Sequence, residues 1–302
     1  MILASEYELL REDAGAVERR RGKLLLEGAE TAAFLQGQVT NDVEGLAPGT
    51  GCYALLLGHK GKVRFDMRIL RGPDWIWIDC AKGALPVLQH TIRTYGIGRD
   101  MRSRDVTEER SVVSVIGPRA RAALGVDVPE EEHAFVDDGG VLHVATDVGV
   151  DVIGPPEALA PEIPAVSEEV AEVLRIESGR PRFGLDFDGD TIPQEAGLNE
   201  RAVSFTKGCY VGQETVARLH YKGKPNRHLR GLRLSEPAER GVELRLGERV
   251  VGALGSAAVS PVHGPIALAL VRREAEPGAV LEVGADGVTA QVVELPFRKS
   301  DG

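Results

Sequence analysis

Eight consecutive residues carry the densest set of reactive side chains in this chain: Lys207-Gly208-Cys209-Tyr210-Val211-Gly212-Gln213-Glu214. The octet combines a thiol, an ammonium, an amide and a carboxylate with two glycines. A nearby lysine and a following helix would both favour the thiolate, which is the reactive and ligand-forming state of cysteine. The octet therefore predicts a working thiol at Cys209. The competing interpretation is a structural cysteine packed beside Tyr210.

The two other cysteines have apolar neighbours and are predicted to be core residues. Cys80 ends the run Trp75-Ile76-Trp77-Ile78-Asp79, and Cys52 precedes Tyr53-Ala54-Leu55. No two cysteines have the close spacing of a zinc motif, so no metal site is predicted. An odd number of cysteines in a cytoplasmic chain indicates reduced thiols.

A second candidate is Glu177, in the segment Arg175-Ile176-Glu177-Ser178-Gly179. The segment reads as the end of an amphipathic helix that stops at the glycine. A negative charge near a helix C-terminus is disfavoured by the dipole, so this carboxylate needs hydrogen-bond donors from the protein or from a ligand. A pterin ring offers such paired N–H donors. The alternative is a salt bridge with Arg175 or Arg180.

Two further patterns carry weaker signals. In the strand expected over residues 63–70, alternation puts Arg64, Asp66 and Arg68 on one face, where a surface ion pair is the ordinary interpretation and a catalytic Asp66 the alternative. The polar run from Gln36 to Asp42, which includes Asn41, follows an expected helix and could be capping chemistry alone.

Composition and charge limit the class of function. The chain has 302 residues and a formal net charge of −10, which argues against direct, non-specific nucleic-acid binding. Basic residues nevertheless gather between Lys207 and Arg233, including Arg218, as a solvated face or a site for an anionic ligand. No apolar run approaches the roughly 20 residues that span a bilayer, so a cytoplasmic protein with no membrane association is expected.

Hydrophobic periodicity predicts an α+β fold. Helices are expected over residues 31–38, 85–94 and 167–176, and strands over 23–26, 52–57, 63–70, 75–79, 111–116, 141–144 and 150–153. From about Leu229 short strands recur between glycine or proline turns, as in a small barrel or sandwich. The predicted domains are residues 1–225, with two lobes, and residues 226–302, a C-terminal β-barrel.

The octet resembles the signature of the YgfZ-type folate-binding proteins, relatives of the glycine-cleavage T-proteins (aminomethyltransferases). The resemblance extends over nearly the whole chain, through Phe34–Asp42, Lys60–Arg68, the segment around Glu177, and Gly264–Arg273. The octet is specific to the family, whereas the segment around Glu177 is shared with T-proteins.

The resemblance implies a three-lobed ring that binds tetrahydrofolate and serves iron–sulfur cluster assembly or repair, with indirect effects on tRNA modification. Its partners would be folate and iron–sulfur or cluster-assembly proteins. Glu177 matches the pterin-binding carboxylate, Cys209 the signature cysteine, and Asn41 and Arg218 are further candidates for folate contact. The octet residues around Cys209 complete the candidate site: Lys207, Gly208, Tyr210, Gly212, Gln213 and Glu214.

One departure bears on the alternative function, tetrahydrofolate-dependent aminomethyl transfer. T-proteins carry an Asp-Asp pair in the hairpin strand, where this chain has Phe65-Asp66. One carboxylate is kept, and T-proteins lack the octet, so the YgfZ-type interpretation is preferred. Whether the protein catalyses a reaction is left open by the sequence. The candidate catalytic residues are Cys209 and Asp66.

Overall fold

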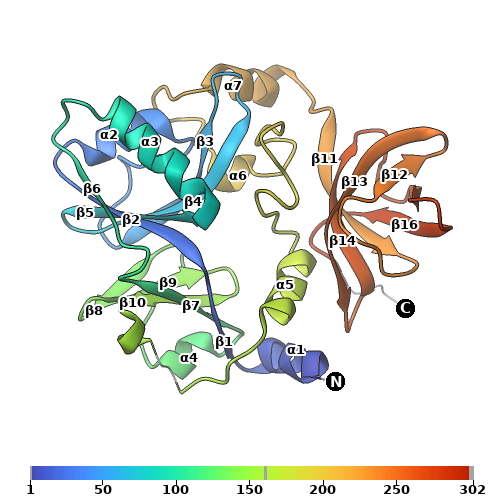
Figure 1. The fold of residues 1–302 in the computed structure, drawn as a ribbon, viewed down its shortest axis with the longest axis horizontal. Helices are drawn as coiled ribbons and strands as arrows, with labels where there is room; N and C mark the ends of the chain where they lie inside the picture. Colours follow the sequence, from blue (N-terminus) through green and yellow to red (C-terminus); the bar gives the residue numbers. More distant parts are fainter. Residues whose placement is uncertain (1, 160–161, 299–302) are drawn as a thin grey trace. The chain divides into compact units, whose positions relative to one another are not determined.

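The computed structural model describes residues 2–159 and 162–298, which divide into two compact units. The first unit comprises residues 1–60, 64–168 and 200–213, and the second comprises residues 61–63, 169–199 and 214–302. Figure 1 shows the fold. None of the helices in the described ranges is long and apolar enough to cross a membrane. The predicted boundary at residues 225/226 stays a prediction.

The first unit contains two five-stranded sheets. The first sheet has the order β3 (Thr50–Leu57), β4 (Val63–Arg71), β5 (Trp75–Ala81), β2 (Arg21–Glu27) and β6 (Arg102–Asp105). Helices α2 (Thr31–Gln38) and α3 (Leu85–Tyr95) lie on one side of it (Figure 1). Alternate residues of β4, Phe65, Met67 and Ile69, are fully buried, because the strand turns one face to apolar side chains.

The second sheet of this unit has the order β1 (Gly15–Glu18), β7 (Ser111–Ile116), β10 (Gly149–Gly154), β9 (Val141–Thr146) and β8 (Phe135–Asp138). The remaining elements of the unit are α1 (Ile2–Glu12), η1 (Lys82–Ala84), α4 (Ala120–Leu124), η2 (Pro156–Ala158) and α6 (Asn199–Ala202). One apolar cluster takes Leu70 and Trp77 from the first sheet and Val144 and Ile153 from the second. The two sheets therefore pack on each other through a shared core.

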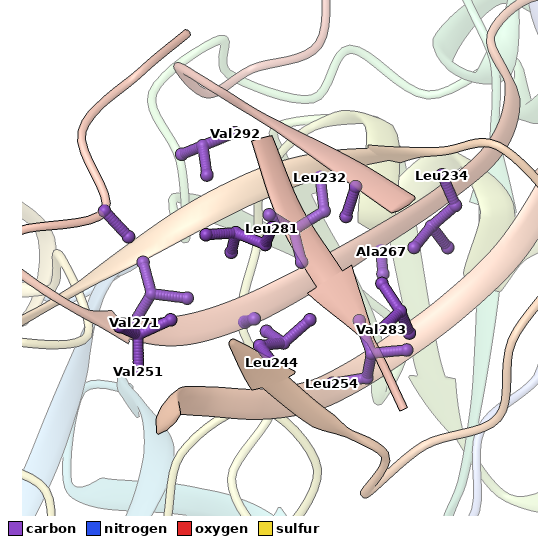
Figure 2. Close-up of a cluster of buried hydrophobic side chains, with 13 residues drawn as sticks. Leu232, Leu234, Leu244, Val251, Leu254, Ala267, Val271, Leu281, Val283 and Val292 are labelled. Carbon is purple, nitrogen blue, oxygen red and sulfur yellow. The ribbon is translucent and has the colours of Figure 1, made fainter. Parts of the chain in front are cut away.

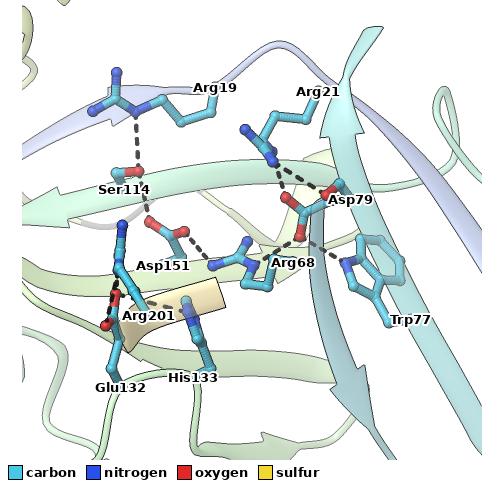
Figure 3. Close-up of polar contacts among 10 residues, drawn as sticks. All are labelled: Arg19, Arg21, Arg68, Trp77, Asp79, Ser114, Glu132, His133, Asp151 and Arg201. Carbon is cyan, nitrogen blue, oxygen red and sulfur yellow. Dashed lines mark hydrogen bonds and ion pairs between the residues drawn. The ribbon is translucent and has the colours of Figure 1, made fainter. Parts of the chain in front are cut away.

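The same interface between the sheets has a polar part centred on Arg68 (Figure 3). Arg68 lies opposite Asp79 in the β4–β5 register and donates from Nε to its Oδ2 at 2.8 Å. Its Nη1 reaches Asp151 of β10, in the other sheet, at 2.6 Å. Burial would raise the pKa of the Asp79 carboxyl, but Arg68 and Arg21 outweigh it and hold that pKa at about 2. The guanidinium thus ties the two sheets together with charges that stay paired at neutral pH.

This finding corrects the expectation for the polar face of β4. Alternation placed Arg64, Asp66 and Arg68 on one face and suggested a surface ion pair. Arg64 is exposed and Asp66 is half-buried, but Arg68 is only 6% exposed. The second sheet packs on this face of β4. The alternation of residues within one strand does not show whether another sheet packs on either of its faces.

In the second unit, helix α5 (Glu168–Glu177) packs through Ile176 against Ile266, Leu268 and Phe297 of the C-terminal part. Arg175 of α5 donates to Asp186 at 2.9 Å and to Ser256 at 2.5 Å, and the Ser256 N–H donates to Asp186 at 2.8 Å. These bonds hold the end of α5 in one position. Helix α7 (Gln213–Lys222) precedes the strands.

Six antiparallel strands close into a barrel, in the order β11 (Arg227–Leu234), β14 (Gly264–Arg272), β13 (Arg249–Ser260), β12 (Glu243–Leu246), β15 (Val280–Val283) and β16 (Val288–Val293). Its interior is filled by aliphatic side chains, including Leu232, Leu244, Leu281 and Val292 (Figure 2). Closure leaves no unpaired strand edge. The C-terminal β-barrel and the α+β class predicted from the sequence are confirmed.

We expect Arg68→Met to lower the free energy of unfolding by roughly 3–5 kcal/mol, because it leaves the buried Asp79 and the partly buried Asp151 without their shared partner. Urea denaturation followed by circular dichroism would measure this. Arg104→Met is the matched control, since its pair with Glu109 is more than half exposed on both sides, and its loss should be below about 1 kcal/mol. Equal losses in the two variants would contradict the structural role of Arg68.

Candidate functional site

The octet follows α6 and is irregular in structure up to Gly212, and its last two residues, Gln213 and Glu214, are the first two of α7. Gly212 has a φ of +84°, in the left-handed region that favours glycine, and α7 begins at the next residue. The glycine therefore turns the chain from the irregular part of the octet into the helix. Cys209 lies four positions before the first residue of α7, so it is not at the helix terminus itself.

Lys207 anchors the octet to the C-terminal end of α2. Its Nζ donates to the carbonyl oxygens of Gln36, Val39 and Asn41 at 2.7, 2.7 and 2.9 Å. The last carbonyls of a helix lack partners within the helix, and the negative end of its dipole favours a cation. All three N–H groups of the ammonium are used, so none is left to donate to the Cys209 thiolate. This differs from the role predicted for Lys207, which was to stabilise that thiolate.

The structure thereby joins two patterns that the sequence analysis treated separately. The polar run Gln36–Asp42 and the octet form one hydrogen-bonded frame, strengthened by a bond from the Val211 N–H to the Gly37 carbonyl at 3.4 Å. The ring of Tyr210, which is buried, lies 5.1 Å from the Lys207 Nζ in a cation–π contact. The three carbonyls and the ring together hold the ammonium of Lys207 in place.

Cys209 is the exposed cysteine, whereas Cys52 and Cys80 are buried. Burial raises the pKa of both the Cys52 and Cys80 thiols to about 12, which keeps them protonated at neutral pH. The core positions predicted for these two residues are confirmed. Beside Cys209, a Cβ added at Gly208 would meet no atom within 4 Å. The thiol is therefore reachable, and the backbone next to it is open.

Glu177 belongs to the second unit, at the C-terminal end of α5, and is 7% exposed. Its Oε1 accepts the hydroxyl of Ser260 at 2.5 Å. The same hydroxyl oxygen accepts the N–H groups of Val262 and His263 at 3.1 and 2.9 Å, which fixes its direction. The carboxylate that the sequence placed at an unfavourable helix end thus receives a donor from the barrel.

Asp66 belongs to the first unit and is half-buried on β4. Its Oδ2 accepts the hydroxyl of Tyr53, on β3, at 2.7 Å. The guanidinium of Arg201 lies 5.0 Å from the centre of the Tyr53 ring and forms an ion pair with Glu132 (Figure 3 shows the pair). Burial, followed by the charge of Asp66, raises the pKa of Tyr53 well above its usual value, so the hydroxyl stays a donor.

Tyr53, Arg201, Arg68 and Asp79 were missed by sequence reasoning. Asp79 had a readable signal: a charged residue within the apolar run Trp75–Cys80 must find a partner if the strand is buried. The other three had no such signal, because each of them meets a partner on another element of the fold.

The remaining candidates have simpler positions. The Asn41 amide nitrogen donates to the carbonyl of Tyr53 at 2.9 Å and to that of Arg201 at 3.4 Å, so its donors are used within the protein. Arg218 and Glu214 are exposed on α7, and Gln213 begins that helix. The roles of all these residues toward a ligand stay predictions.

Three comparisons with known proteins agree with one another. A family model described as the GCVT N-terminal domain matches residues 1–136. Proteins named tRNA-modifying protein YgfZ, from Escherichia coli strain K12 and from Shigella flexneri, are 30% identical over 295 residues, which cover 90% of this chain and 89% of theirs. The glycine cleavage system aminomethyltransferase T from Bartonella henselae has a similar fold, with a TM-score of 0.88, 20% identity, and coverage of 98% of this chain and 90% of that one.

We expect Lys207→Met to destabilise the first unit by about 2–4 kcal/mol, because three carbonyls lose charge-assisted donors. Hydrogen exchange of the amides from Ser204 to Gly212 should become faster, as measured by mass spectrometry. Lys60→Met, at an exposed lysine of the same unit, is the control. Unchanged exchange in Lys207→Met would show that the anchor does not hold the octet.

Proposed function

The chain belongs to the YgfZ family, and on this basis we propose that it is a tetrahydrofolate-binding accessory protein for iron–sulfur cluster assembly or repair, with an indirect effect on tRNA modification. The observation that carries the proposal is the exposed thiol of Cys209 on a segment that is anchored to the fold by Lys207. Glu177 is the proposed carboxylate for the pterin.

The chemistry of Glu177 fits a pterin. An ionised carboxylate has about four acceptor positions, so bonds from the protein leave room for a ligand's donors. The bond from Ser260 fixes the orientation of the carboxylate before a ligand arrives, which reduces the entropy lost on binding. Arg218, exposed on α7, is a suitable partner for the anionic tail of a folate. Bound tetrahydrofolate would carry or accept a one-carbon unit.

The role proposed for Cys209 is a transient one. Iron–sulfur clusters are usually held by four cysteines, so one thiolate cannot hold a cluster alone. Cys209 can instead lend one ligand while a cluster, as cargo, passes between partner proteins, or exchange with a partner's thiol. Cys52 and Cys80 cannot act as ligands or exchange with a partner's thiol in this way, because they are buried.

One observation favours a second candidate function, aminomethyl transfer on tetrahydrofolate. Asp66 is held by the Tyr53 hydroxyl in a partly buried position, as a polar catalytic group would need to be. Bartonella aminomethyltransferase T supports only the likeness of fold. The accessory role is preferred because it also uses the exposed thiol.

For the folate part of the proposal, we expect Glu177→Gln to weaken tetrahydrofolate binding by roughly 10–100-fold, because a charged acceptor is lost. Isothermal titration calorimetry on the wild type and on each variant would measure it. Cys209→Ala should bind like the wild type, and Glu169→Gln, at an exposed acid on the same helix, is the control. Absence of binding to the wild type would remove folate from the function.

For the thiol part, we expect Cys209→Ser to abolish complementation of an Escherichia coli strain that lacks YgfZ, whereas Asp66→Asn should keep most of it. The measurement is the activity of iron–sulfur enzymes in the complemented cells, with protein levels checked by immunoblot. The opposite pattern, with Asp66→Asn inactive and Cys209→Ser active, would favour aminomethyl transfer, to be confirmed by assaying methylenetetrahydrofolate formation.

A further inference from the structure

A hollow of about 460 Å³ lies at one end of the first sheet of the first unit, beside the first turn of α2. The most buried residues that line it are apolar: Leu26 of β2 is 0% exposed and Ile76 of β5 is 4% exposed. Ile76 lies opposite Leu26 on one side and Arg71 of β4 on the other, so these three residues form one row across the sheet. The volume is within the range of roughly 300–1,000 Å³ that is typical of small-molecule sites.

Thr31, the first residue of α2, also lines the hollow and is 3% exposed. Its hydroxyl has no hydrogen-bond partner within residues 2–159 and 162–298. Buried hydroxyls are nearly always paired, because an unpaired one gives up its bonds to water without replacement. A ligand in the hollow would supply the partner that the protein lacks.

The start of α2 has no side-chain cap. Glu30 precedes the helix, but its carboxylate accepts the backbone N–H of Asp100, at 2.6 Å, and makes no capping bond. The N–H of Thr31 donates to the Gly28 carbonyl at 3.2 Å, whereas the N–H of Ala32, which also lines the hollow, has no acceptor in the part of the chain that the structure describes. A free N–H at the positive end of a helix dipole favours a negative group.

Arg71 brings a positive charge to the same place. Its Nη1 donates to the carbonyls of Val43 and Glu44 at 3.2 and 3.1 Å, and these bonds position the half-buried guanidinium. Among the described residues, its Nε and Nη2 groups have no acceptor. An arginine with unused N–H groups is suited to a carboxylate, which can accept two of them. The inner part of the hollow therefore suits an anionic group.

The exposed rim of the hollow has the opposite charge. Glu27, the last residue of β2, lies opposite Trp75, and Asp74 directly precedes Trp75, so the two carboxylates belong to neighbouring strand ends. Both acids are exposed, and neither forms an ion pair with another residue of the described ranges. These carboxylates would repel a simple anion but attract a ligand that also has a cationic group.

We propose that this hollow binds a small zwitterion, namely a free amino acid with an apolar side chain. Its carboxylate meets Arg71, the Thr31 hydroxyl and the Ala32 N–H. Its ammonium faces Glu27 and Asp74, and its side chain packs on the apolar row of the sheet. This assignment uses every charged group that lines the hollow, whereas an anion or a cation alone would leave one set of charges opposed.

The proposal does not depend on the proposed function, because Cys209, Glu177 and Asp66 are not among the residues that line the hollow. Ligand-observed NMR titrations of the whole chain, made without folate, would use leucine, methionine and phenylalanine as probes. We expect saturable binding with a Kd of about 0.1–1 mM, as for small ligands of this number of atoms. No binding of any of the three at about 10 mM would overturn the proposal.

Two analogues of leucine separate its two charged ends. Leucinamide keeps the ammonium and lacks the carboxylate, and N-acetylleucine keeps the carboxylate and lacks the ammonium. We expect each to bind roughly tenfold more weakly than leucine, because each loses one set of charge-assisted contacts. If either analogue binds as well as leucine, the hollow does not recognise a zwitterion.

Variants at the rim locate the ammonium. The double variant Glu27→Gln with Asp74→Asn changes two exposed side chains and should fold like the wild type. We expect it to weaken leucine binding about fivefold and to leave the binding of N-acetylleucine unchanged. Unchanged leucine binding would show that the probe binds elsewhere on the protein.

Thr31→Val removes the unpaired hydroxyl at nearly constant volume. We expect it to weaken leucine binding about fivefold while Tm stays the same or rises, because the hydroxyl has no partner within the protein to lose. Thr94→Val, at an exposed threonine of α3, is the control and should leave binding unchanged. Full binding in Thr31→Val, or a fall in Tm together with the loss of binding, would overturn the contact between this hydroxyl and the ligand.

Discussion

The guanidinium of Arg68 is the interaction on which the first unit depends, because it bonds to carboxylates in both sheets. Two faces of β-sheet can pack through aliphatic side chains in several registers, whereas a buried ion pair leaves one arrangement in which the charges are matched. Arg68 bonds Asp79 within its own sheet and Asp151 across the interface. Ser114 donates to the second oxygen of Asp151 at 2.6 Å, so that carboxylate is also held from its own sheet. The apolar cluster around Leu70 and Trp77 supplies the rest of the interface.

Positioning by backbone carbonyls is the second recurrent device. Lys207 and Asn41 both donate to main-chain oxygens rather than to side chains. Such bonds do not depend on the rotamer of the acceptor, so they define the position of a loop sharply. The exposed thiol of Cys209 is thereby carried by a segment whose neighbours are fixed, which is the usual arrangement of functional groups on loops supported by a rigid scaffold.

The two units use the same chemistry for their candidate carboxylates. In the first, the Tyr53 hydroxyl occupies one oxygen of Asp66, and in the second, the Ser260 hydroxyl occupies one oxygen of Glu177. A neutral donor fixes the direction of a carboxylate without neutralising its charge, whereas a bidentate arginine would engage both oxygens. Each acid is therefore oriented by a hydroxyl donor from a neighbouring strand. The barrel supplies Ser260 from the end of β13, and its closed core makes that a fixed position.

The sequence by itself determined the elements and much of their chemistry. The helix expected over residues 31–38 has those bounds as α2, the alternating segments after Leu229 form the strands of the barrel, and the apolar neighbours of Cys52 and Cys80 correctly indicated buried thiols. These features follow from local periodicity and composition, which a linear pattern contains. The family signature likewise singled out Cys209 and Glu177, whose roles stay proposals.

Only the tertiary structure decided what covers each face and which partner each charge meets. A period of two assigns Arg68 to a face of β4, but whether that face meets water depends on a sheet built from residues more than 40 positions away. Lys207 stands beside Cys209 in sequence, yet its ammonium serves a helix end 171 positions earlier. Residues that are neighbours in the chain need not contact each other through their side chains. A side chain bonds to whatever lies near it in space, and the packing of the whole chain decides which residues those are.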